Sequence, residues 1–261
     1  MDSLERRRVQ SAFDRAALRY DQWSELQQRV ARDLATTLEP GAAAGGWVLD
    51  AGCGTGDALP WLARHAQERL VALDFAPAML QAARRRQPGV AAVCADLHAL
   101  PFCAGRFDLV WTSLTLQWCR LAPALGECAR VLTPAGRLYA TTLGPATLGE
   151  LRTAFAAVDT HPRVRSFSAA AEVSAALDVC GLLPLRFETR IYTLYRPSLR
   201  AVLDDIKGIG ANVSAARPAP LSRAAWRAVE AQYERLRTAQ GLPTSYEVLQ
   251  VVAARAPSGR S

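Results

Sequence analysis

The stretch Val48-Leu49-Asp50-Ala51-Gly52-Cys53-Gly54-Thr55-Gly56 decides the fold of this chain. A predicted strand runs directly into three glycines at alternate positions, and helical spacing follows them. Glycines in such a turn can adopt positive φ, and they leave the backbone open to a ligand because no Cβ stands in the way. The spacing differs from the dinucleotide pattern G-x-G-x-x-G, and the lysine and hydroxyl of a phosphate loop are missing. We therefore expect a cofactor cradle without a pyrophosphate or triphosphate site, with a purely structural tight turn as the alternative.

From residue 46 onward, short apolar runs alternate with stretches of helical spacing. The runs predict strands at 46–51, 69–74, 90–95, 107–112, 136–142, 185–195 and 246–254. Strands that alternate with crossover helices form a parallel sheet covered on both faces. The sequence thus predicts a Rossmann-like α/β fold with a seven-stranded, mostly parallel sheet and helices on both faces.

The chain divides into three parts around this core. Apolar spacing predicts two helices within residues 1–45, which we expect to form a lid segment. Residues 46–145 are expected to hold the cofactor. Residues 146–261 complete the sheet, with helices inserted at about 196–241 that join the lid. A Gly/Pro-rich loop is predicted at 208–220 inside that insertion.

Composition excludes several classes of protein. The chain has 261 residues, of which 50% are apolar and 21% charged, as expected for a globular protein with a sizeable core. No apolar run approaches the roughly 20 residues of a membrane helix, and no apolar core follows the N-terminal arginines, so we expect neither a membrane protein nor a secreted one. The six cysteines form no C-x-x-C pair, which argues against a zinc site or a disulfide framework. A cytoplasmic protein is expected.

The charge is basic and unevenly distributed. The net charge of +7 comes from 30 arginines and a single lysine, Lys207. Residues 1–40 carry 7 basic and 7 acidic side chains, whereas residues 146–261 carry 15 and 10. The arginines are scattered, so we do not expect a nucleic-acid partner. The basic surplus in the C-terminal half could instead steer an acidic partner.

Three acids follow successive strands of the predicted sheet. Asp50 stands at the end of the first strand, Asp74 ends the second, and Asp96 follows the third, with Leu97 next to it. Ligands of open α/β sheets bind at this edge, where a carboxylate can accept both hydroxyls of a ribose. Each acid alone could be a helix cap or a turn residue. Three acids in register are typical of a nucleoside-containing cofactor.

These motifs resemble motifs I, II and III of class I S-adenosylmethionine-dependent methyltransferases. The resemblance implies S-adenosyl-L-methionine as cofactor and S-adenosyl-L-homocysteine as product. It also implies a set of cofactor-binding residues, namely Asp50, Gly52, Cys53, Gly54, Gly56, Asp74, Phe75, Met79, Asp96, Leu97, Thr112 and Ser113.

Segments outside the core make the resemblance specific to one family of methyltransferases. Leu116-Gln117-Trp118-Cys119 and Lys207-Gly208-Ile209-Gly210-Ala211 are similar to segments of the malonyl-[acyl-carrier protein] methyltransferases of biotin synthesis, and the likeness covers nearly the whole chain. That family implies transfer of a methyl group to the free carboxylate of a malonyl thioester, the first step of pimeloyl chain assembly. The partner implied is malonyl-acyl carrier protein, or malonyl-CoA. The chain departs from the family at Arg163 and Arg165, where a histidine and an asparagine are expected.

The acceptor side has several candidate residues but no certain catalytic one. A carboxylate is already ionised at neutral pH, so its methylation needs positioning rather than a general base. The candidates for positioning are Tyr20, Gln117, Trp118, Lys207, Arg163 and Arg165. Three of them have a structural alternative: Tyr20 and Trp118 could pack in the core, and Lys207 could be a solvated helix-end residue. Arg163 and Arg165 compete with Lys207 for the carboxylate.

Three other functions stay open on the sequence alone. The same fold could methylate another small acid or a quinone ring carbon. It could also be a methyltransferase-fold assembly factor that transfers no methyl group, although the intact glycine and acid motifs argue against lost cofactor binding. Nucleic-acid binding is the third alternative, and the scattered arginines argue against it.

Overall fold

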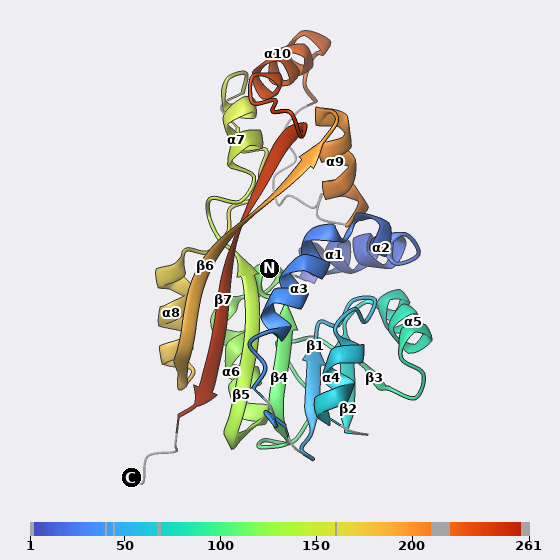
Figure 1. The fold of residues 1–261 in the computed structure, drawn as a ribbon, viewed down its shortest axis with the longest axis vertical. Coiled ribbons are helices and arrows are strands. Elements are labelled where there is room, and N and C mark those ends of the chain that lie inside the picture. Colours follow the sequence, from blue (N-terminus) through green and yellow to red (C-terminus); the bar gives the residue numbers. More distant parts are fainter. Residues whose placement is uncertain are drawn as a thin grey trace.

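The computed structural model describes residues 3–39, 41–43, 45–66, 69–159, 161–209 and 220–256. Strands and helices alternate along this part of the chain (Figure 1). The strands are β1 (Val48–Ala51), β2 (Leu70–Asp74), β3 (Ala91–Cys94), β4 (Phe107–Ser113), β5 (Leu132–Leu143), β6 (Leu182–Arg196) and β7 (Leu242–Arg255). The helices are α1 (Ser3–Ala16), α2 (Tyr20–Trp23), α3 (Glu25–Ala35), α4 (Leu59–Ala66), α5 (Pro77–Arg86), α6 (Leu121–Val131), α7 (Gly149–Ala156), α8 (Ala170–Val179), α9 (Leu199–Gly208) and α10 (Arg223–Glu234), with a 3₁₀ turn η1 (Leu116–Trp118).

The strands form one sheet in the order β3-β2-β1-β4-β5-β7-β6. Strands β1 to β5 pair in parallel, and β7 runs antiparallel to both β5 and β6. The strand order reverses at β1, which lies between β2 and β4. Ligands of such sheets bind beyond the carboxyl ends of the strands at this reversal. The predicted fold class is confirmed, and the glycine stretch lies at the expected edge.

Both faces of the sheet are buried. Leu49 and Leu73 belong to a cluster with residues of α6 and α8, whereas Val48 and Ala72 belong to a second cluster with residues of α3, α4 and α5. Successive side chains of a strand point to opposite faces, so this alternation places helices on each side. A parallel sheet requires such cover.

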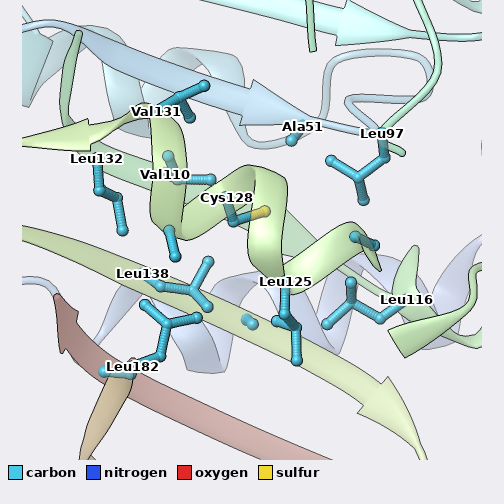
Figure 2. Packing of buried hydrophobic residues seen from close by; sticks show 14 of the residues in the cluster. Ala51, Leu97, Val110, Leu116, Leu125, Cys128, Val131, Leu132, Leu138 and Leu182 are labelled. Carbon is cyan, nitrogen blue, oxygen red and sulfur yellow. The ribbon is translucent and has the colours of Figure 1, made fainter. Parts of the chain in front are cut away.

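Figure 2 shows the first of these clusters at close range. Leu125 and Cys128 of α6 lie against the strands, with Val110 and Leu138 nearby and Leu182 at the start of β6. All five side chains are at most 1% exposed. This packing fixes the carboxyl ends of β1 and β4, from which the site is built.

The last two strands extend beyond the sheet. Residues 248–254 of β7 pair with β5, whereas residues 242–247 pair only with β6. The resulting hairpin carries α9 and α10 at its far end, next to α7 (Figure 1). The helices inserted between the last two strands are thus found where they were predicted. Residues 210–219 of the predicted Gly/Pro-rich loop lie outside the described residues.

The N-terminal segment differs from the two helices expected. It holds three helical segments, because the chain leaves helical geometry at Arg19 (φ −122°, ψ 3°) and again at Ser24 (φ −91°, ψ 27°). Ser24 is 2% exposed, and its hydroxyl accepts a hydrogen bond from Nε2 of Gln28 at 3.0 Å. The interruption produces the single-turn helix α2, which packs against α9.

Candidate active site

The glycine turn after β1 has the open backbone that was expected. Gly52, Gly54 and Gly56 all have positive φ, at +83°, +53° and +84°. A Cβ on Gly52 would lie 2.3 Å from Oγ1 of Thr115, so only glycine fits there. A Cβ on Gly54 would meet no described atom within 4 Å, so this position faces open space. The turn therefore combines tight packing at one glycine with an exposed backbone at another.

Asp50 is buried under this turn. It is 2% exposed, and its Oδ2 has no hydrogen-bond partner among the described residues. Burial, together with the nearby charges of Asp74 and Asp57, raises the pKa of Asp50 well above its ordinary range. A cationic group placed beside Oδ2 would provide the missing partner and lower that pKa.

Asp74 connects the ends of two strands. Its Oδ2 accepts a hydrogen bond from the backbone N–H of Gly54, and its Oδ1 accepts one from the N–H of Ala76, both at 2.9 Å. Burial raises the pKa of Asp74 to about 6, although the backbone hydrogen bonds lower it. Each carboxylate oxygen can accept a further hydrogen bond. Asp74 is thus fixed in an orientation that can bind two hydroxyl groups.

Asp96 lies beyond β3 and has cationic and imidazole neighbours. Arg6 of α1 forms an ion pair with its Oδ2, and Nδ1 of His98 lies 2.7 Å from its Oδ1. Burial raises the pKa of Asp96, but the hydrogen bonds from His98 and Arg6 outweigh it, and the net shift is downward. Asp96 therefore stays ionised at neutral pH.

The N-terminal segment lies across these acids. Besides the Arg6 ion pair, Nε2 of Gln10 donates to the carbonyl oxygen of Phe75 at 2.5 Å, and Asp14 accepts from the N–H of Ala78 at 3.0 Å. Further along, the hydroxyl of Thr55 donates to Asp21 of α2 at 2.6 Å. Residues 6–21 thus touch the ends of β2 and β3 and the glycine turn.

A first cavity lies between the sheet edge and this segment. Eight of the predicted cofactor residues line it: Gly52, Gly54, Asp74, Phe75, Met79, Asp96, Leu97 and Ser113. Asp50 and Cys53 line an adjoining small cavity that shares Gly52 and Gly54. Gly56 and Thr112 line none of these cavities. A Cβ on Gly56 would contact Leu59 and Ala83 between α4 and α5, and Thr112 is fully buried in the sheet.

A second, larger cavity of about 340 Å³ adjoins the first. The structure brings all six predicted acceptor-side residues to its wall: Tyr20, Gln117, Trp118, Arg163, Arg165 and Lys207. The guanidinium of Arg165 lies 4.9 Å from the ring centre of Trp118, and Arg163 forms a 2.6 Å ion pair with Asp159. Lys207 is exposed, so it stands at the mouth of the cavity.

Four residues separate the two cavities because they line both: Phe13, Tyr20, Leu114 and Trp118. The ring centres of Phe13 and Trp118 are 5.5 Å apart with perpendicular planes. Leu114 has φ +48°, which is unusual for a residue with a side chain. Its strained backbone is held by hydrogen bonds from its N–H to Thr141 and from Nε2 of Gln117 to its carbonyl oxygen.

Sequence reasoning missed several residues of these cavities. Phe13 and Leu114 line both cavities, but no chemical feature of a phenylalanine or a leucine marks it as a site residue in the sequence. Arg6 and His98 contact Asp96, and neither was predicted. Only the position of His98, two residues after a predicted site acid, offered a signal.

The two cavities differ in their charged residues. Asp74 and Asp96 line the first cavity, where Arg6 and His98 lie beside Asp96. Arg163, Arg165 and Lys207 line the second cavity, which has no aspartate, glutamate or histidine among its described lining residues. Burial, followed by the charge of Asp74, raises the pKa of Tyr20 far above neutrality, so its hydroxyl stays protonated. The described wall therefore offers cations to an acceptor and no general base.

Fold and site together define a class I S-adenosylmethionine-dependent methyltransferase. The residues fit that cofactor, because the unpartnered Oδ2 of Asp50 suits its ammonium group and the open face at Gly54 leaves room against the backbone. Residues 49–140 match the methyltransferase domain family. A solved structure of geranyl diphosphate C-methyltransferase from Streptomyces coelicolor with Mg²⁺, geranyl diphosphate and S-adenosyl-L-homocysteine has the same fold, with TM-score 0.54 and 18% identity over 87% of this chain and 77% of that one.

Closer relatives identify the family within this class. A malonyl-[acyl-carrier protein] O-methyltransferase of Herminiimonas arsenicoxydans is 39% identical over 257 residues, which cover 97% of each chain. The biotin biosynthesis bifunctional protein BioHC of Cellvibrio japonicus is 38% identical over 254 residues, or 96% of this chain and 50% of that protein. This chain belongs to the malonyl-[acyl-carrier protein] O-methyltransferase family. The predicted cofactor and enzyme class are thereby confirmed.

Proposed function

We propose that this protein methylates the free carboxylate of malonyl-[acyl-carrier protein] to its methyl ester, for biotin synthesis. The observation that carries the proposal is the second cavity, which has three cations, no described general base and a wall shared with the cofactor side. An alcohol or a phenol would have to lose a proton before methylation, whereas a carboxylate is already ionised. The names of the relatives supply the malonyl group and the carrier protein.

The residues take complementary roles in this proposal. Bound S-adenosyl-L-methionine supplies a methyl group on a positively charged sulfur. Asp50 binds the ammonium group, Asp74 the ribose hydroxyls and Asp96 the adenine edge. Arg165, held against Trp118 at the wall between the cavities, orients the carboxylate, and the aromatic side chains keep water away from it. Orientation of the two reactants is worth about 7–11 kcal/mol in well-aligned systems.

The location is also part of the proposal. None of the helices in the described part of the chain has the length and apolar content that a bilayer crossing needs. The six cysteines are all free thiols. Free thiols persist in reducing compartments, and this supports a cytoplasmic enzyme that meets its carrier protein there.

Mass spectrometry tests the proposal directly. The enzyme is incubated with S-adenosyl-L-methionine and either malonyl- or acetyl-carrier protein. We expect one added methyl group on the malonyl thioester and none on the acetyl thioester, which lacks the acceptor. Methylation of free small acids or quinones without methylation of malonyl thioesters would contradict the proposal. Restored growth of a biotin auxotroph that lacks this step checks the same function in cells.

A further inference from the structure

Helix α1 has two chemically distinct faces. Its inner face carries Arg6, Gln10 and Asp14, whose side chains contact Asp96 and the backbone of α5 and of the residues before it. Val9 and Ala12 on the same helix are buried. These contacts hold α1 over the cofactor cavity and leave the opposite face in solvent.

The outer face is defined here as Arg8 and Arg15 of α1 together with Leu18 and Arg19 of the turn that follows this helix. All four are exposed, and Leu18 is 85% exposed, the most of any large apolar residue described. No side-chain hydrogen bond or ion pair joins the three arginines to a described residue. The first 40 residues balance in charge as a sequence, but their described carboxylates have partners other than these three arginines. Asp14 accepts from the N–H of Ala78. The other four pair with residues elsewhere: Asp21 with Arg86, Glu25 with Arg29 and Arg196, Asp33 with Tyr192, and Glu39 with Arg137. The outer face is therefore basic, with one exposed apolar side chain, Leu18.

This face lies beside the mouth of the second cavity. Tyr20, the residue after Arg19, lines that cavity. Trp23 of α2 then packs so closely on α9 that a Cβ on Gly208 would lie 2.3 Å from its Cγ. Gly208 follows Lys207, the exposed cation at the cavity mouth. Figure 1 shows the same arrangement, with α1, α2 and the end of α9 grouped together.

We propose that the outer face of α1 docks the acidic surface of the acyl carrier protein that delivers the substrate, an inference that rests on the proposed function. The three arginines meet carboxylates of the carrier, and Leu18 packs on its apolar surface. The thioester arm then enters beside Tyr20, and Lys207 binds the phosphate of that arm. Exposed charges of this kind act mainly on the association rate, and salt screens them over about 8 Å at physiological ionic strength.

Helix α10 provides a matched comparison. Its Arg223 and Arg227 are exposed and four residues apart, as Arg15 and Arg19 are. However, no residue of α10 lines either cavity, and the helix lies at the far end of the β6–β7 hairpin (Figure 1). Charge alone predicts docking at α10 as well as at α1, whereas proximity to the mouth favours α1.

The test compares kcat/KM for malonyl-carrier protein with kcat/KM for malonyl-CoA in three proteins: wild type, R15E/R19E and R223E/R227E. We expect R15E/R19E to lower the ratio of the two values at least tenfold at low ionic strength, and the loss to shrink at 0.5 M salt. We expect R223E/R227E to change it less than twofold. If R15E/R19E lowers the melting temperature, R15Q/R19Q is used in its place. L18Q tests the apolar contact without a change of charge, and we expect it to lower the same ratio.

Several results would overturn the docking surface. These are an unchanged ratio in R15E/R19E, an equal loss with both substrates, or a carrier-specific loss in R223E/R227E alone. Direct binding of the carrier protein to the enzyme, measured without turnover, separates this proposal from the proposed function. If wild type methylates neither malonyl thioester but binds the carrier protein through Arg15 and Arg19, the proposed function is wrong and the proposed docking surface is supported. If wild type methylates both thioesters and R15E/R19E binds the carrier protein normally, the docking surface is wrong and the proposed function is supported.

Discussion

Replacing Asp74 by asparagine tests the centre of the cofactor cradle. Asparagine keeps one acceptor oxygen for the N–H of Gly54 or Ala76, but it loses the charge and one of the two acceptors. A hydrogen bond to a charged group contributes about 1.5–3 kcal/mol, so loss of one charged ribose contact predicts a cost of about that size. Because 1.4 kcal/mol is a factor of ten, affinity for S-adenosyl-L-homocysteine should fall at least about tenfold.

The pH dependence gives this prediction its second readout. Burial raises the pKa of Asp74 to about 6 from an ordinary 3.8, so the native state holds a proton between these values that the unfolded chain has lost. The stability contributed by the protonated form is therefore lost as pH rises from about 4 through 6, by about 3 kcal/mol in total. Ligand affinity has the opposite trend, since the ionised form binds the hydroxyls. Wild-type affinity should fall as pH drops below about 6, and the part of this fall that comes from protonation of Asp74 should be absent in Asp74→Asn.

Calorimetry with S-adenosyl-L-homocysteine between pH 5 and 8 measures the loss of ligand affinity and the pH dependence of that affinity. Asp108→Asn is the matched control, because Asp108 also accepts a backbone hydrogen bond, from the N–H of Trp47 at 3.0 Å, but lines neither cavity. It should lower the melting temperature and leave ligand affinity within twofold of wild type. Unchanged affinity in Asp74→Asn, or an equal loss in both variants, would refute the assignment of Asp74.

Three further predictions concern the cover and the acceptor side. Gly208→Ala should raise KM for malonyl thioesters in steady-state assays with little change in S-adenosyl-L-homocysteine affinity, because its Cβ would displace Trp23. Hydrogen exchange in α1–α3, α9 and α10 should slow when S-adenosyl-L-homocysteine binds, and equal protection with and without it would count against a lid. Arg165→Gln should raise KM at least tenfold, and Arg163→Gln should raise it less, because Arg165 lies against Trp118 at the wall that the two cavities share; the reverse order would assign the carboxylate to Arg163.

The sheet and the acids of the site could be predicted from the sequence because the patterns that indicate them are local. A strand that ends in glycines specifies its own turn, and acids at the ends of parallel strands must share one edge. Asp50, Asp74 and Asp96 therefore needed no knowledge of distant contacts. The acceptor candidates came from the family resemblance, and all six line the second cavity.

Features that depend on distant contacts could not be predicted in the same way. Leu114 adopts a positive φ that its own side chain disfavours, and its strained backbone is held by Thr141 and Gln117. The fit of Trp23 on Gly208 joins segments 185 positions apart in the chain. The role of Arg6 likewise depends on an acid 90 positions away. Such pairs leave no periodic pattern in the sequence.

The separation of charges has a chemical reason in an enzyme that methylates carboxylates. The acids that we propose to bind the cofactor are carboxylates like the acceptor, so any of them placed beside the methyl group could be methylated instead of the substrate. Phe13, Tyr20, Leu114 and Trp118 form the shared wall, and no described acid lines the cavity beyond it. The carboxylates thus lie on one side of this wall, with Arg6 and His98 beside Asp96, whereas the cations on the other side have no carboxylate among the described lining residues. This arrangement favours methylation of the substrate carboxylate over methylation of the protein's own acids, and it requires no general base.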